Sequence, residues 1–198
     1  MHLSRTTKPS LAVVSTADMK THMRVTHSDE DAYIDTLVAA ATYWAENYTG
    51  RAFLTQTWTL NLRCFPSGDI PLPRPPLASV TSLKYRRDAT TTTTLVLDTD
   101  YEIHTGTGSD FACVAPYYGT TWPTPIDTPN AVQVVYVCGW TAAANVPADI
   151  VHAVKMVAAE LYERREQTIS GTIITDVRMA AQRLLQPHVV QHWGYPLD

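Results

Sequence analysis

The sequence predicts an α+β protein in which N- and C-terminal helices form a small bundle and an antiparallel β subdomain is inserted between them. Three observations support this class: a long amphipathic helix before Gly50, a middle region whose apolar residues alternate, and a second long helix opening at Pro147. A chain of 198 residues suffices for one hydrophobic core but is short for two. We therefore expect one domain over residues 1–198, comprising helical parts at 15–50 and 146–186, a β insert at 54–140 and a tail at 187–198.

Two helices are predicted before the β insert, whereas the first fourteen residues are largely polar and are expected to be irregular. Ser15 or Thr16 can cap a short helix over Ala17–Arg24. The hydroxyl of Ser28, followed by three carboxylates, indicates the start of a longer helix, and Gly50 supplies the left-handed residue that ends it. The apolar stripe of the longer helix has the spacing of one helix face and consists of Tyr33, Leu37, Ala41, Trp44 and Tyr48, with Ile34, Val38 and Ala45 beside it.

The middle of the chain changes to a period of two, which is typical of strands. In Thr55–Arg63, the side chains of Trp58, Leu60 and Leu62 face one way and polar side chains face the other. A run of five threonines suits a loop tip and the start of the next strand, because β-branched residues favour extended backbone. Further strands are predicted at Val80–Tyr85, Thr94–Leu97, Tyr101–His104, Phe111–Val114 and Ala131–Cys138.

Four prolines precede the strand at Val80–Tyr85 and hold the chain extended, because proline fixes φ and disfavours helix in the residue before it. Proline cannot donate a ladder hydrogen bond and therefore sits at sheet edges. We expect the extended arm, Pro71–Leu77, to lie at a boundary between subunits, with Pro71, Pro73 and Pro75 in the interface.

The segment Pro116–Pro129 is predicted to be a long ordered loop that carries Tyr117, Tyr118 and Trp122 among four prolines. Exposed aromatic loops usually have something to touch. These aromatic side chains are therefore expected either to contact a neighbouring subunit or the next protein, or to fold back over their own β subdomain. The sequence leaves both alternatives open.

The C-terminal part contains two predicted helices and an apolar tail. The first helix carries the stripe Ile150, Val154, Val157 and Leu161, and a shorter one over about 176–185 stops before Pro187. Terminal segments without a partner are usually polar, but this tail is rich in apolar side chains. They either bind another protein or pack on the bundle, and they are Val189, Val190, Trp193, Tyr195 and Leu197.

The composition excludes several classes of protein. With 45% hydrophobic and 17% charged residues and a net charge of -4, the chain is typical of a globular protein without bulk affinity for nucleic acid. No stretch reaches the roughly 18 apolar residues of a membrane span, and no signal peptide is evident, so we expect the protein to stay in the cytoplasm. Cys64, Cys113 and Cys138 lack paired spacing and are expected to be half-buried thiols, with neither disulfide nor zinc.

Motifs for catalysis or metal binding are missing from the sequence. There is no G-x-S-x-G, no H-E-x-x-H and no Walker lysine. The glycine-rich Gly106–Ser109 predicts a turn, since no helix follows to complete a phosphate cradle. His188 and His192 have helical ligand spacing but no third ligand nearby. We therefore expect no enzyme activity, no cofactor and no metal.

Two groups of charged residues have alternative interpretations. At the end of the second long helix, Arg164 and Arg165 can pair with glutamates of their own helix, or with a carboxylate of an adjacent subunit. In the β insert, the concentration of basic residues is a weak indication of phosphate binding, and it comprises Arg63, Lys84, Arg86 and Arg87.

A series of short motifs carries a resemblance to a known family. In order, these are GRAFLTQTW, PLPRPPLASVTSLKY, VVYVCGW, VPADI and LYERRE. Over roughly residues 15 to 190 the chain resembles the tailed-phage head–tail connector (adaptor) family, which is found in siphovirus-type phages, prophages and gene transfer agents. The resemblance implies a structural subunit of a dodecameric ring beneath the portal, located in the neck of a phage-like particle that is assembled in the bacterial cytoplasm.

The resemblance also implies the partners. These would be further copies of the chain, the portal protein, the next connector or stopper protein on the tail side, and genomic DNA that passes without sequence-specific contact; no membrane is implied. Connectors of this type commonly bind the portal through their C-terminal region, which favours the tail as the portal-binding segment. A DNA-binding accessory protein of genome packaging is the alternative, and a hydrolase would need a nucleophile and base that the sequence does not offer.

Overall fold

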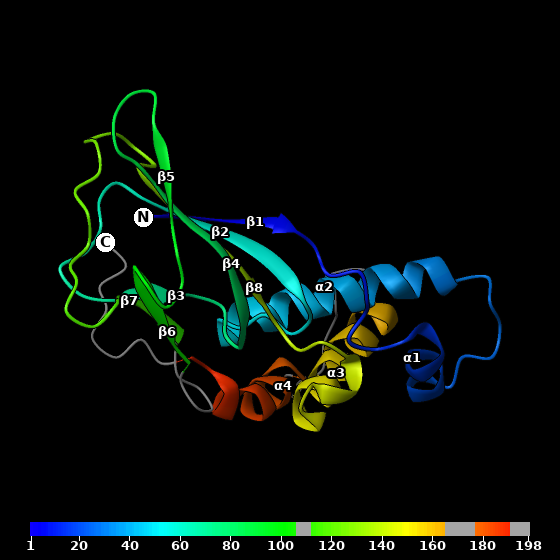
Figure 1. Cartoon of the computed structure of the whole chain (residues 1–198). Coiled ribbons are helices and arrows are strands. Elements are labelled where there is room, and N and C mark those ends of the chain that lie inside the picture. Colours follow the sequence, from blue (N-terminus) through cyan, green and yellow to red (C-terminus); the bar gives the residue numbers. More distant parts are fainter. Residues whose placement is uncertain (106–111, 165–176, 191–198) are drawn as a thin grey trace. The chain divides into compact units, whose positions relative to one another are not determined.

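The computed structural model describes residues 1–105, 112–164 and 177–190 and confirms the α+β class (Figure 1). The chain divides into two compact units. The β unit contains Met1–Pro9, Thr55–Trp140 and Val190, and the helical unit contains Ser10–Leu54 and Thr141–Val189. Each unit therefore combines segments that are far apart in the sequence.

The helical unit is a small bundle in which α3 packs against both α2 and α4, while the short helix α1 contacts α2 and α3 (Figure 1). This confirms the predicted packing of the two long helices against each other. The bounds of the elements are α1 Thr16–Met23, α2 Asp31–Thr49, α3 Ala148–Glu163 and α4 Val177–Leu185, with short 3-10 turns at Ala143–Asn145 and Gln186–His188.

The buried face of α2 lies beside the predicted stripe. Its buried apolar residues are Ile34, Val38, Ala41 and Ala45, whereas the larger side chains predicted to lead the stripe are partly exposed. The bundle places small and branched residues at the centre of the contact, where the helices can approach closely, and leaves large aromatic residues at its margin. The opposing face of α3 is buried through Ile150, Ala153, Val154, Val157 and Ala158.

The helix ends follow the predictions in two cases out of three. Ser15 caps α1 by accepting a hydrogen bond from the backbone N–H of Asp18 at 3.1 Å, and Gly50 ends α2 in the left-handed region at φ 71°. The predicted cap at Ser28 is wrong: Glu30 precedes the first turn without a side-chain cap, and the Ser28 hydroxyl accepts from Lys20 Nζ at 3.2 Å instead.

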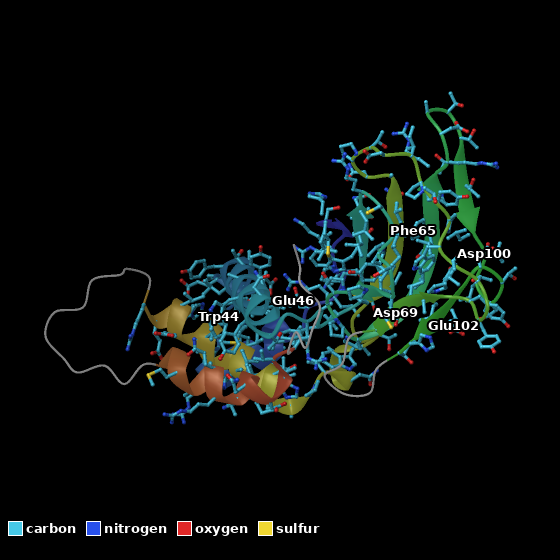
Figure 2. The ribbon with its side chains drawn as sticks, turned by 90° about the vertical axis from the view of Figure 1, so that its left-hand side faces the viewer. Trp44, Glu46, Phe65, Asp69, Asp100 and Glu102 are labelled. Carbon is cyan, nitrogen blue, oxygen red and sulfur yellow. The ribbon has the colours of Figure 1, made fainter. Side chains whose placement is uncertain are left out.

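A buried carboxylate organises the chain where it leaves α2. Glu46 lies on the last turns of the helix, close to Trp44, and both are labelled in Figure 2. Glu46 Oε1 accepts a hydrogen bond of 2.9 Å from the backbone N–H of Phe53, a residue without solvent exposure. This bond satisfies a buried donor that the reversing chain would otherwise leave unpaired.

The β unit contains two antiparallel sheets. The larger has the strand order β1-β2-β8-β4-β5, and the smaller has the order β3-β7-β6. The bounds of the strands are β1 His2–Thr7, β2 Gln56–Leu62, β3 Ile70–Leu72, β4 Leu77–Arg86, β5 Thr92–Leu95, β6 Tyr101–His104, β7 Ala112–Pro116 and β8 Val132–Cys138. All the predicted strands are present, with ends that differ by a few residues.

The first strand corrects the expectation of an irregular start. β1 pairs antiparallel with β2 along its length, from His2 opposite Asn61 to Thr7 opposite Thr57. It is an outer strand whose residues are exposed or half-buried, so its sequence lacks the apolar alternation that reveals strands with one buried face. The β unit therefore includes residues that precede the helical part of the chain.

The core of the β unit centres on β8, whose Val132, Val134, Tyr136 and Cys138 are all buried. The three cysteines correct the expectation of uniformly half-buried thiols. Cys138 is buried at the end of this strand, Cys113 is half-buried on β7, and Cys64 is exposed in the loop after β2. Burial and the nearby carboxylate of Asp69 raise the pKa of the Cys113 thiol to about 11.

Candidate functional site

The extended arm begins as an outer strand of the smaller sheet. Pro71 lies in β3 opposite Cys113 of β7, between the buried side chains of Ile70 and Leu72. An outer strand tolerates proline because the missing N–H faces away from the ladder. The predicted edge position of this proline is thereby confirmed, while its contact with another subunit stays a prediction.

The rest of the arm contacts the larger sheet of its own unit. The Tyr136 hydroxyl donates to the carbonyl of Pro73 at 2.9 Å, and the backbone N–H of Gly139 donates to the carbonyl of Pro76 at 2.8 Å. The guanidinium carbon of Arg74 lies 5.3 Å from the centre of the Trp58 ring, within cation–π range. These intrachain contacts fix the arm before any assembly takes place.

Trp122 packs on its own β unit, which is one of the two alternatives that the sequence leaves open. Its ring stacks on Phe65 with a centroid distance of 4.8 Å and an interplanar angle of 10°, and its indole N–H donates to the carbonyl of Gly68 at 2.8 Å. Phe65 also meets the edge of the Tyr85 ring at 5.9 Å. The indole thus holds the loop after β7 against the loop after β2.

The two tyrosines of the same loop are placed differently. Tyr118 is 92% exposed and Tyr117 is 38% exposed. The backbone N–H of Tyr117 donates to the carbonyl of Asp100 at 3.1 Å, which ties this turn to the turn between β5 and β6. That second turn exposes two apolar side chains, and the resulting apolar tip consists of Val96, Leu97, Tyr117 and Tyr118.

Several hydrogen bonds stabilise the backbone of the apolar tip. The Asp100 carboxylate, labelled in Figure 2, accepts from the backbone N–H of Val96 at 2.8 Å. Gly119 has φ 77°, a conformation that favours glycine, and the N–H of Thr120 returns to the carbonyl of Tyr117 at 2.8 Å. Sequence reasoning missed Val96 and Leu97 as surface residues, because it assigned both to the preceding strand.

Two of the charged side chains singled out in the sequence, Arg63 and Arg164, form ion pairs within the chain. Arg164, which follows α3, pairs with Glu160 of the same helix at 3.5 Å, and Arg165 lies outside the described residues. Arg63 makes a two-pronged contact with the Asp127 carboxylate at 2.7 and 3.1 Å. The hydrogen bond and charge of Asp127 raise the pKa of Arg63, so the guanidinium stays protonated, and the carboxylate offsets its charge locally.

Three segments of the helical unit converge on the turn after α4. The Tyr48 hydroxyl donates to Gln186 Oε1 at 3.0 Å, Arg51 Nε donates to the carbonyl of His188 at 2.6 Å, and His188 Nε2 lies 2.6 Å from Asp149 Oδ2. His188 thus has a carboxylate partner, and His192, the other histidine of the predicted pair, lies outside the described residues. Sequence reasoning missed Tyr48, Arg51 and Asp149 here, because nothing in their local pattern indicates contacts with residues so distant in the chain.

The electrostatics of this turn favour the ionised carboxylate. Burial by itself would raise the pKa of Asp149, but the hydrogen bond and charge of His188 and nearby backbone N–H groups lower it below its usual value. Arg51 is only 4% exposed, and burial lowers the pKa of its guanidinium. A desolvated cation of this kind requires nearby acceptors, and the His188 carbonyl is one of them.

The apolar tail is described only at its start. Val189 is half-buried and Val190 is buried. The predicted portal-binding residues Trp193, Tyr195 and Leu197 lie outside the described residues. Their role, and the alternative that the tail packs on its own bundle, both stay open.

Features that would indicate chemistry are sparse in the part of the chain that the structure describes. Within it, no group of three His, Cys, Asp or Glu side chains could hold a metal ion, and no helix is long and apolar enough to cross a membrane. A groove beside α1 is lined by Lys20, Arg24 and Asp31 together with threonines and apolar residues. Lys20 and Asp31 pair at 2.8 Å, and the groove offers no histidine or cysteine among the residues that line it.

Part of the chain resembles a known protein family. Residues 15–93 match the sequence model of a family described as "Phage gp6-like head-tail connector protein". This match confirms the resemblance to the head–tail connector family. The description of that family names a connector and no enzyme activity.

Solved structures with the same fold come from gene transfer agent (GTA) particles. A chain of "Neck of empty GTA particle computed with C6 symmetry" is similar at 22% identity with a TM-score of 0.78, and one of "Virion of native gene transfer agent (GTA) particle" at 22% with 0.77. A chain of "Neck of native GTA particle computed with C12 symmetry" has 22% identity and a TM-score of 0.71. Each comparison covers 98% of this chain and 99% of the other. Among curated protein sequences, none matches significantly.

Proposed function

We propose that this chain is a head–tail connector subunit that forms a ring, a dodecamer, beneath the portal of a phage-like particle. The ring extends the channel for the genome and joins the head to the next connector or stopper protein on the tail side. The observation that carries the proposal is the similarity of fold over nearly the entire chain to a chain of a particle neck. The connector family match over residues 15–93 supports it independently.

The ring requires two different surfaces on each subunit, because a closed cyclic assembly is built from head-to-tail contacts. Particle necks that contain chains of this fold were computed with C6 and C12 symmetry, which supports the dodecamer. The apolar tip is the best supported contact surface, since Tyr118 is almost fully exposed and aromatic residues are enriched in interface cores. The remaining proposed interface residues are Pro71, Pro73, Pro75, Arg164 and Arg165, whereas Trp122 packs on its own β unit.

The portal contact is assigned to the tail after Gln186, with Val189, Trp193, Tyr195 and Leu197 as the binding residues, because Val190 is already buried within this chain. Each large apolar side chain that becomes buried in a partner contributes about 1.5–3 kcal/mol before ordering costs. Repetition around a ring converts weak single sites into a firm attachment. No exchange of covalent bonds is needed, so the proposed function requires no cofactor.

The decisive experiment adds purified protein to portal-bearing heads that lack connector and counts attached rings by electron microscopy. The full chain should attach, whereas variants ending at Gln186 or lacking Gly194–Asp198 should remain folded by circular dichroism and fail to attach. Normal attachment of both truncated chains would remove the tail from the portal contact. Failure of the full chain to form any ring, alone or on heads, would contradict the connector assignment itself.

The alternative of a DNA-binding accessory protein finds less support. The contact of Arg63 with Asp127 neutralises one of the four basic residues on which it depends, and the net charge of -4 opposes phosphate binding. A DNA shift assay at 50 and 200 mM salt distinguishes the two functions. Tight binding that weakens steeply with salt would favour the alternative.

A further inference from the structure

The contacts around the turn after α4 suggest a role beyond holding the helical unit together. We infer that Tyr48, Arg51 and Asp149, acting on Gln186 and His188, form a tail clamp that sets the point and direction at which the chain leaves the helical unit. This inference rests on the proposed function, because the chain that leaves at this point is the proposed portal-binding tail. It assigns positioning residues to that attachment, on segments other than the tail itself.

The clamp holds Gln186 and His188 from two segments of the helical unit. Tyr48 lies in the last turn of α2 and Arg51 just after it, and they bind the Gln186 side chain and the His188 carbonyl. Asp149 comes from the first turn of α3 and binds the His188 ring. The backbone carbonyl and the side chain of His188 are thus held by different segments, which fixes the orientation of the peptide as well as its position.

The docking of α4 does not depend on these contacts. Ala181 and Leu185 of α4 have no solvent exposure, and the helix packs against α3. The His188 side chain, in contrast, is 21% exposed and follows the end of the helix. Loss of the His188–Asp149 pair should therefore leave the bundle intact and release only the residues that follow α4.

The distances indicate strong contacts. Both the Arg51–His188 and the His188–Asp149 contacts measure 2.6 Å, slightly shorter than the about 2.7–2.9 Å usual for hydrogen bonds from an N–H donor that involve charged groups. Such bonds are stronger than neutral ones, so a turn held by two of them should open rarely. A rigid exit point lowers the entropy cost of placing a short tail on its partner, and the same gain is repeated in every subunit of a ring.

The first test measures amide hydrogen exchange in the full chain and in His188→Ala and Asp149→Ala. We expect exchange at the amides of residues 188–190 to rise about tenfold or more in both variants, the size expected for the loss of a hydrogen bond to a charged group, with unchanged exchange in α2 and α3. Asp149→Asn keeps an acceptor oxygen without the charge and should give a smaller rise. His104→Ala, which removes an exposed histidine 3.1 Å from the Glu102 carboxylate in the β unit, is the matched control.

The second test measures attachment of the same variants to connector-free, portal-bearing heads. His188→Ala and Asp149→Ala should attach at least fivefold more weakly than the full chain and His104→Ala, while their melting temperatures stay within a few degrees. Unchanged exchange at residues 188–190, or faster exchange with normal attachment, would overturn the clamp. If His188→Ala does not fold, Asp149→Asn alone decides by the same two measurements. Normal attachment of the chain ending at Gln186 would instead contradict the proposed role of the tail, whatever the clamp variants do.

Discussion

Asp88 shows how one carboxylate organises the turn between β4 and β5. Its Oδ1 atom accepts hydrogen bonds from the backbone N–H groups of Thr90 at 2.9 Å and Thr91 at 2.8 Å, and from the Thr90 hydroxyl. These donors stabilise the ionised form and lower the pKa of Asp88 to about 2. The Asp88 carboxylate thereby closes the turn at the start of the threonine run.

The pKa of Asp88 gives a prediction with a definite sign. Because the folded pKa lies below the unfolded value of about 4, the contribution of the carboxylate is fully present above pH 4 and is lost as the pH falls toward 2. The Asp88 carboxyl resonance should therefore titrate near pH 2 in an NMR experiment, and Thr90 and Thr91 amide signals should move with it. Titration near pH 4 would show that the turn does not hold the carboxylate as described.

At the scale of single elements, Glu46 determines how α2 gives way to the chain that follows. Replacing Glu46 with alanine leaves the buried N–H of Phe53 without its 2.9 Å acceptor, which should lower the free energy of unfolding by about 1–3 kcal/mol. Glu46→Gln retains an acceptor and should cost less. Urea denaturation measures both, with Glu163→Ala at the exposed end of α3 as control; equal effects of Glu46→Ala and Glu163→Ala would contradict the prediction.

The loop after β7 offers a second test at this scale. Trp122→Ala removes the stack on Phe65 and the hydrogen bond to Gly68. Since the indole is only half-buried, we expect a loss of about 1–3 kcal/mol in stability, less than for a fully buried tryptophan. Thermal melting of the isolated chain checks this. Unchanged melting together with weakened assembly would restore Trp122 to the subunit interface.

The limits of sequence reasoning also lie at the scale of elements. Periodicity identified α2 and α3 and all the interior strands, because burial on one face imposes a repeat that the sequence must carry. The predicted stripe on α2 was wrong in its centre. Periodicity does not separate Tyr33 and Trp44 from Ile34 and Ala45, but the two aromatic side chains are too large to lie where helices approach closely. Strand β1 carried no repeat, because its exposed and half-buried residues at a sheet edge need none.

The candidate sites were predictable to different degrees for the same physical reason. Pro71 at a sheet edge follows from the chemistry of one residue. Tyr118 is exposed whereas Trp122, four positions later, is half-buried, because Trp122 lies against the loop after β2. Local sequence does not show which loop will lie opposite. The contact between Asp149 and His188 joins residues 39 positions apart, and the one from Arg51 spans 137; no local pattern encodes such pairs.

At the scale of the whole molecule, a substitution of Tyr118 in the apolar tip can test assembly without affecting folding. Tyr118→Ala removes a side chain that is 92% exposed, so the melting temperature should change by no more than about 1 °C, as for most surface substitutions. If the apolar tip lies in the contact between subunits, ring formation should require at least tenfold more protein, measured by analytical ultracentrifugation. Rings that form at the normal concentration would exclude Tyr118 from that contact, and Lys8→Ala serves as an exposed surface control in the same unit.

The division of the helical unit into two distant segments has a consequence for how the protein is made. The ribosome completes α2 long before it reaches α3, because the whole middle of the chain is translated between them. At about 5–20 residues per second, the apolar side of α2 waits on the order of ten seconds for its partner. During that interval Ile34 and Val38 are open to chaperones or to other nascent chains, and a product that terminates early, anywhere between the two helices, never covers them. Translation that slows within the β segment should therefore lower the yield of native protein more than an equal delay after α3.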